Sequence, residues 1–73
     1  RIPAGPQIKA GEEHAQVAMV RQRLGLAVPQ GGKDEVFDAT LVAAVKAFQS
    51  QSGLKPTGTI NTPVRTALNG ALQ

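Results

Sequence analysis

Hydrophobic residues recur at helical spacing in the middle of the chain, where the stripe consists of Leu41, Ala44, Val45 and Phe48. Asp38 stands directly before this stripe, where its carboxylate can cap free backbone N–H groups. Phe37 precedes the cap and can pack back onto Val42, as in a hydrophobic staple. Gly53 follows as the left-handed residue that ends a helix. The pattern therefore predicts a helix that begins after Asp38 and stops before Gly53.

An earlier stripe predicts a first helix, and its inward residues are Val17, Val20 and Leu24. We expect this helix to begin at about Glu12, with Glu12 and Glu13 in its first turn, and to stop at Gly25. Residues 1–11 hold several proline and glycine residues, which block a helix. This segment is predicted to be an extended arm or linker that lies across the domain surface, with the folded domain at residues 12–73.

A third helix is predicted near the end of the chain, with Val64, Ala67 and Leu68 facing inward. Asn61 or Thr62 starts it, Pro63 suits its first turn, and Asn69-Gly70 ends it. Five positions of the middle segment have counterparts of similar type here at a constant spacing: Phe37, Asp38, Leu41, Ala44 and Val45 match Ile60, Asn61, Val64, Ala67 and Leu68. This weak repeat predicts two related loop-helix units.

The remaining segments limit the fold classes that are possible. Residues 27–36 contain Pro29, Gly31 and Gly32 and are predicted to form a flexible loop between the first two helices. No segment alternates Val or Ile with polar residues as a strand would. The predicted architecture is all-α, a small three-helix bundle with an extended N-terminal arm. With 73 residues the core is near the lower limit for independent folding, so any binding site must be shallow.

Composition narrows the function classes. The formal net charge of +3 favours acidic partners, among them acidic peptides, anionic lipids and nucleic acids. The chain begins at Arg1 and has neither a signal peptide pattern nor an apolar run long enough to cross a membrane. We therefore expect a piece of a longer protein, without membrane insertion.

The sequence lacks the residues that most catalytic mechanisms need. There is no cysteine, and a serine-based site would need His14 as its base together with an orienting carboxylate at a spacing that is not found. His14 is also the only histidine, so a zinc site is not expected. Asp34, Glu35 and Asp38 are explained more simply by loop solvation and capping than as paired catalytic carboxylates. We expect a noncatalytic domain with no metal and no cofactor.

Several motifs resemble the small peptidoglycan-binding domain that is appended to bacterial cell-wall enzymes. Residues 37–49 with the trailing Gly53-Leu54 are similar to its central helix, Phe-x-x-x-(Thr/Leu)-x-x-Ala-Val-x-x-Phe-Gln. Residues 17–24 are similar to its Val-x-x-Leu-(Gln/Arg)-x-Arg-Leu, and residues 57–69 to its Asp-Gly-x-Ile-Gly and Ala-Leu-Asn close. The departures from the family pattern are Thr57 for Asp, Asn61 for Gly and Val64 for Thr.

The resemblance implies a noncatalytic module that binds peptidoglycan, through its glycan or its stem peptides, and tethers a covalently attached enzyme to the cell wall. Arg21, Arg23 and Leu68-Asn69 resemble most the copies in large periplasmic L,D-transpeptidases. Such a parent catalytic domain in cis, and a periplasmic or cell-envelope location, are what this likeness implies.

The candidate ligand contacts are polar residues beside the apolar stripes. Arg21 and Gln49 lie at stripe edges, where partial exposure is expected, and both match motif positions of the family. Lys46, Arg65 and Asn69 are further candidates. Such side chains can bind the amides and carboxylates of stem peptides, whereas a glycan platform is disfavoured because the chain has no Trp or Tyr.

Alternative interpretations stay open at this point. Arg21 and Gln49 can equally well hydrogen-bond to nearby backbone in loops, and the other candidates can be solvated surface residues. The whole domain can be structural, packing on the parent catalytic domain and orienting it. A helix-turn-helix-like nucleic-acid binder is the third possibility, ranked last because Lys and Arg are scattered and the third helix offers only Arg65.

Overall fold

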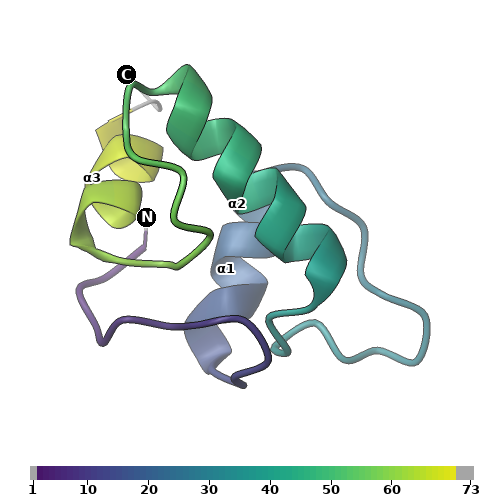
Figure 1. Cartoon of the computed structure of the whole chain (residues 1–73). Coiled ribbons are helices and arrows are strands. Elements are labelled where there is room, and N and C mark those ends of the chain that lie inside the picture. The colour runs from purple at the N-terminus through teal and green to yellow at the C-terminus, as the bar shows by residue number, and fades with distance from the viewer. Residues whose placement is uncertain (1, 71–73) are drawn as a thin grey trace.

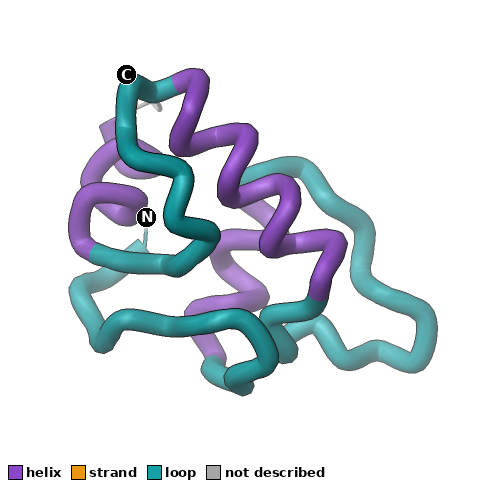
Figure 2. Tube along the Cα trace, in the orientation of Figure 1, coloured by secondary structure: helices purple, strands orange, loops and turns teal. Residues whose placement is uncertain are grey.

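The longest helix, α2 (Ala39–Gln51), crosses the front of the molecule, with α1 (Ala15–Arg23) behind it and α3 (Thr62–Gly70) to one side (Figure 1). This computed structural model describes residues 2–70. Over that range the chain forms helices and loops with two isolated antiparallel β-bridges (Figure 2). The predicted all-α three-helix bundle is confirmed. None of the helices described combines the length and apolar character needed to cross a bilayer.

The second and third helices begin in the same way. Asp38 Oδ1 accepts a hydrogen bond from Leu41 N at 3.0 Å, and Asn61 Oδ1 accepts one from Val64 N at 3.0 Å. Each capping side chain satisfies a backbone donor that the first helical turn leaves free. These caps occupy equivalent positions of the predicted repeat. Asn61, which departs from the family pattern, therefore starts α3 as Asp38 starts α2.

The first helix begins later than predicted, at Ala15 rather than near Glu12. Backbone groups just before it are bonded to the loop that leads into α2, and Phe37 N donates to Glu12 O at 2.9 Å. This pairing holds the two glutamates in an extended conformation outside the helix. His14 takes the capping position, where its Nδ1 accepts from Gln16 N at 3.0 Å. His14 thus stands at the cap of α1, before its first turn.

The core draws on every part of the described chain. The predicted helical stripes are buried or half-buried, which confirms their inward faces. The buried hydrophobic residues are Ile2, Ile8, Val17, Val20, Phe37, Leu41, Val45, Ile60, Val64 and Leu68. Ile2 and Ile8 belong to the arm, which is extended as predicted but does more than lie across the surface. Its two isoleucines complete the core.

The arm also joins the two repeat units through backbone hydrogen bonds. Ile8 exchanges both of its backbone bonds with Ile60, each at 2.9 Å. Three residues later, Gly11 N donates to Phe37 O at 2.9 Å. Phe37 and Ile60 are equivalent positions of the repeat, each directly before a helix cap. The arm, which runs below α2 in Figure 1, is thus hydrogen-bonded to the residue before the cap of α2 and to the residue before the cap of α3.

Candidate functional site

Arg21 is buried in the structure, with 3% of its surface exposed, so the expected partial exposure was wrong. Its guanidinium reaches from α1 to the loop before α2, where Nη2 donates to Val36 O at 2.8 Å and Nε donates to Asp34 O at 3.3 Å. Nη2 also lies 3.5 Å from Asp38 Oδ2. These contacts match the alternative interpretation, in which Arg21 bonds to backbone in a loop.

Gln49 has a similar position on α2 and is 1% exposed, again against the expected partial exposure. Its Oε1 accepts from Gly58 N at 2.9 Å, and its Nε2 donates to Thr57 Oγ1 at 3.0 Å. Thr57 stands where the family has Asp, and its hydroxyl provides the acceptor that Gln49 needs. Gln49 therefore fixes the loop before α3, as Arg21 fixes the loop before α2.

Arg65 is buried on α3 and holds the arm. Its Nε donates to Gln16 Oε1 at 2.8 Å, Nη1 donates to Gly5 O at 3.1 Å, and Nη2 donates to Pro6 O. Burial lowers the pKa of the Arg65 guanidinium below its ordinary value. These partners are neutral, so oxygen dipoles stabilise the buried charge. A nucleic-acid binder is not supported by α3, because its only basic residue points into the fold.

Asn69, near the end of α3, holds the start of the described chain. Its Oδ1 accepts from Ile2 N at 2.9 Å, and its Nδ2 donates to Ile2 O at 2.9 Å. Four of the five candidate residues thus stabilise the fold through specific hydrogen bonds. Their role as ligand contacts stays a prediction that these internal bonds do not favour.

Lys46 is exposed and lines a groove between α2 and the turn of the arm at residues 9–11. The groove has a volume of about 510 Å³, within the range of ligand-binding clefts. Most of its lining residues are small or apolar, and two are charged. The lining residues are Ala10, Gly11, Val36, Phe37, Asp38, Ala39, Val42, Ala43 and Lys46. Arg21 borders a second hollow beside Met19 and Val28 but is itself buried, whereas Lys46 is an exposed candidate that lines a hollow.

The side chain of Lys46 is positioned by Gly58. A Cβ atom added at Gly58 would lie 2.8 Å from Lys46 Cε and 3.3 Å from Val42 Cγ1, so the lysine stem rests against the glycine backbone. Gly58 also has a φ of +75°, a conformation that favours glycine. Because Gln49 fixes the N–H of this same glycine, the buried amide supports the surface on which Lys46 lies. Gln49 thus acts on the groove through Gly58.

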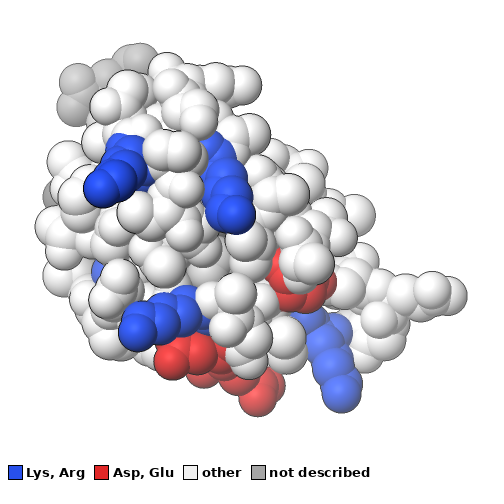
Figure 3. Space-filling view, in the orientation of Figure 1, with Lys and Arg blue, Asp and Glu red and all other residues white. Residues whose placement is uncertain are grey.

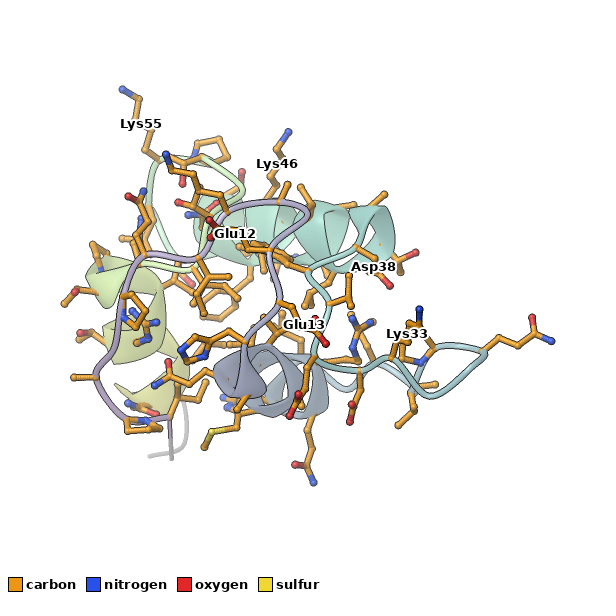
Figure 4. The ribbon with its side chains drawn as sticks, turned by 90° about the horizontal axis from the view of Figure 1, so that it is seen from below. Glu12, Glu13, Lys33, Asp38, Lys46 and Lys55 are labelled. Atoms are coloured by element: carbon orange, nitrogen blue, oxygen red, sulfur yellow. The ribbon has the colours of Figure 1, made fainter. Side chains whose placement is uncertain are left out.

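Charges near the groove have opposite signs at its two ends. Asp38, at the start of α2, has 36% of its side chain exposed, and Lys46 stands two turns further along the helix. Lys46 and Lys55 project to the same side, whereas Lys33 lies on the separate loop before α2 (Figure 4). Basic residues, together with acidic residues along the lower edge, surround an area with little charge on this face (Figure 3). Residues 2–70 contain no cluster of His, Cys, Asp or Glu that could hold a metal ion.

Sequence reasoning missed two parts of this groove. Ala10 and Gly11 form its arm side, but they lie outside any periodic segment, and Gly11 was interpreted only as a helix breaker. Gly58, against which the Lys46 stem lies, entered the sequence analysis only as part of a family motif. The Thr57-Gly58 pair at a family motif position was the available signal, because a glycine at such a turn often marks a close approach of other atoms.

The comparisons with known proteins agree with this architecture. The family model described as "Putative peptidoglycan binding domain" matches residues 13–68, which is most of the 73-residue chain. The matched range includes all of α1 and α2 and all but the last two residues of α3. No curated protein matches the chain, and no solved structure matches it either. The match, together with the capped helical repeat, shows that this chain belongs to the peptidoglycan-binding domain family.

Proposed function

We propose that this chain is a noncatalytic module that holds a covalently attached enzyme at peptidoglycan. The observation that carries the proposal is the family match over residues 13–68. Tethering raises the local concentration of wall polymer around the attached enzyme, so even weak intrinsic affinity is useful. A shallow groove on a 73-residue domain fits this requirement.

The groove beside Lys46 is the contact surface in this proposal. It combines an apolar floor with a cation whose stem is held against Gly58. Arg21, Gln49 and Arg65 contribute indirectly, because they fix the loops and the arm that surround the helices. Asn69 anchors the arm in the same indirect way.

A large periplasmic L,D-transpeptidase is the proposed parent. Support comes from the motif residues Arg21, Arg23, Leu68 and Asn69, which most resemble the copies in those enzymes. Arg23 Nε donates to Leu68 O at 3.1 Å, and Asn69 follows directly with its bonds to Ile2. The proposed location is accordingly the periplasm or the cell envelope.

A second candidate function, packing on the parent catalytic domain, is favoured by an exposed apolar patch. Met19 on α1 is 36% exposed and Val28 in the following loop is 63% exposed. Both border a hollow that includes Leu26 and shares no residue with the groove beside Lys46. A parent domain could therefore cover this patch while the groove stays open to the wall.

Co-sedimentation with purified insoluble peptidoglycan tests the proposed function. The chain should sediment with the polymer in a saturable manner at low and at moderate salt concentration. A DNA gel shift performed beside it should show no retardation. Absence of sedimentation would contradict wall binding and leave packing on the parent as the better function, whereas DNA binding with steep salt dependence would contradict both.

A further inference from the structure

We infer that the groove between the 9–11 turn and α2 binds the stem peptide of peptidoglycan, with a peptide carboxylate at Lys46. This inference rests on the proposed function and adds which component of the polymer is recognised, at which residues, and in which direction.

The chemistry of the lining favours peptide over sugar. Sugar rings are commonly held against exposed aromatic faces, but the chain has no Trp or Tyr, and Phe37 in the groove is only 1% exposed. Ala39, Ala43 and Val42 instead offer a shallow aliphatic surface along α2. Stem peptides carry alanine methyl groups of matching size and contain carboxylates and amides. The groove therefore complements the peptide part of the polymer.

The length of the groove fits a short peptide. Lys46 lies eight positions after Asp38, which corresponds to about 12 Å along a helix. An extended chain advances about 3.3–3.6 Å per residue, so about three or four residues span this distance. A stem peptide in an extended conformation can therefore reach from one charged end of the groove to the other.

Charge sets the direction of the peptide. The Lys46 ammonium is exposed and its stem is held by Gly58, so little side-chain freedom is lost when it binds a carboxylate. Asp38 at the opposite end is already paired with Arg21 Nη2 at 3.5 Å, and that guanidinium also donates to Val36 O, so Lys46 is the cation of the groove lining that is left for a carboxylate. The terminal carboxylate of the peptide is thus placed at Lys46.

An NMR titration of the full chain tests this assignment. The probes are a synthetic stem tetrapeptide that ends in a free D-alanine carboxylate and the same peptide with a C-terminal amide. We expect the amide to bind about tenfold more weakly, the factor that one charge-assisted hydrogen bond contributes. Lys46→Met should lower the affinity for the free-acid peptide by the same factor, so that both peptides bind equally weakly. Lys46→Arg should retain the difference in affinity between the two peptides.

Two matched substitutions separate the groove from the rest of the surface. Ala43→Leu fills the groove from an exposed helical position and should abolish peptide binding, while Ala47→Leu, also exposed on α2 but outside the groove, should not. Lys33→Met removes the same charge as Lys46→Met from a position on the loop before α2 that does not line the groove, and it should leave affinity unchanged (Figure 4). Equal effects of the Ala43 and Ala47 variants, or of the two lysine variants, would overturn the inference.

Failure of the inference can be told from failure of the proposed function. Peptide-free glycan strands, prepared by removing the stems, should not compete with intact peptidoglycan in co-sedimentation. If the chain sediments with peptidoglycan but binds neither tetrapeptide, or if free glycan competes fully, the inference fails and the proposed function stands. If the chain does not sediment with intact peptidoglycan at all, the proposed function fails together with the inference.

Discussion

The buried polar side chains and the groove beside Lys46 use similar chemical groups for different purposes. Arg21, Gln49 and Arg65 are each nearly inaccessible and bind loop or arm backbone, whereas Lys46 is exposed and lines a hollow. The backbone N–H and C=O groups of loops lack the partners that a helix or sheet provides. A small core can hold few loops by hydrophobic contacts alone, so buried polar side chains hold them here. In this domain, therefore, buried polar residues build the fold, and recognition is expected from a residue that the fold leaves free.

The largest expected effect that would test this comparison is that of Arg65→Met. The change leaves Gln16 Oε1 and the carbonyls of Gly5 and Pro6 without their donor. The bond to Gln16 Oε1 is buried, where an unsatisfied polar group costs about 1–3 kcal/mol, and loss of the two part-buried bonds to the arm adds to this, so we expect a loss of about 3 kcal/mol. For a domain of this size that is most of the stability. Circular dichroism during urea unfolding measures it, and an unchanged midpoint would show that Arg65 is not a structural clamp.

Gln49→Ala should affect both stability and binding, because Gln49 fixes the loop on which the Lys46 stem lies. Loss of the bonds to Gly58 N and Thr57 Oγ1 is expected to cost about 2 kcal/mol. Peptidoglycan sedimentation by the folded fraction should also fall, since Gly58 no longer holds the Lys46 stem firmly. Gln51→Ala, on an exposed position of the same helix, is the control and should change neither quantity. Loss of binding at unchanged stability would instead assign Gln49 to direct ligand contact.

The role of Gly58 can be isolated with two glycine substitutions. Gly58→Ala and Gly32→Ala both place alanine at a φ of +75°, but only the first meets Lys46, at 2.8 Å. The left-handed conformation alone costs about 1–2 kcal/mol. Gly58→Ala should therefore displace the Lys46 side chain and should alone weaken peptidoglycan binding, while both variants lose stability through the left-handed conformation. Co-sedimentation would contradict this view if the two variants bound peptidoglycan equally well.

The smallest expected effect on stability among these substitutions is at the start of α1. His14→Ala removes the Nδ1 acceptor of Gln16 N and should destabilise the domain by about 1 kcal/mol, the usual contribution of an N-cap. His14→Asn should restore the cap and recover the unfolding midpoint. If both variants unfold at the same urea concentration, the imidazole does not act as a cap.

Much of the fold was predictable because local signals agreed with the tertiary structure. Asp38 and Asn61 cap helices that their own periodicity predicts, and the hydrophobic stripes face the core. The start of α1 was not predictable in this way. Its position depends on backbone bonds between residues 12–14 and the distant loop at 35–37, and such pairing leaves no local sequence pattern.

The candidate site was predictable only in part for a related reason. Helical periodicity placed Arg21 and Gln49 at the edges of their stripes, but it carried no information about the loops that cover those edges. Lys46 was identified as an exposed cation, while Ala10 and Gly11 escaped notice because the arm has no regular period. Tertiary contacts between segments far apart in sequence decide which polar residues stay accessible.

In this account, buried polar residues stabilise the fold while Lys46 binds the ligand. Co-sedimentation of Lys46→Met with peptidoglycan, measured beside the free energy of unfolding of this variant, tests this central claim most directly. The lysine is exposed, so the substitution should change stability by less than about 0.5 kcal/mol. Binding should fall severalfold, because the carboxylate of the ligand loses its cationic partner. Full binding by the stably folded variant would contradict the account, and so would a loss of binding explained entirely by unfolding.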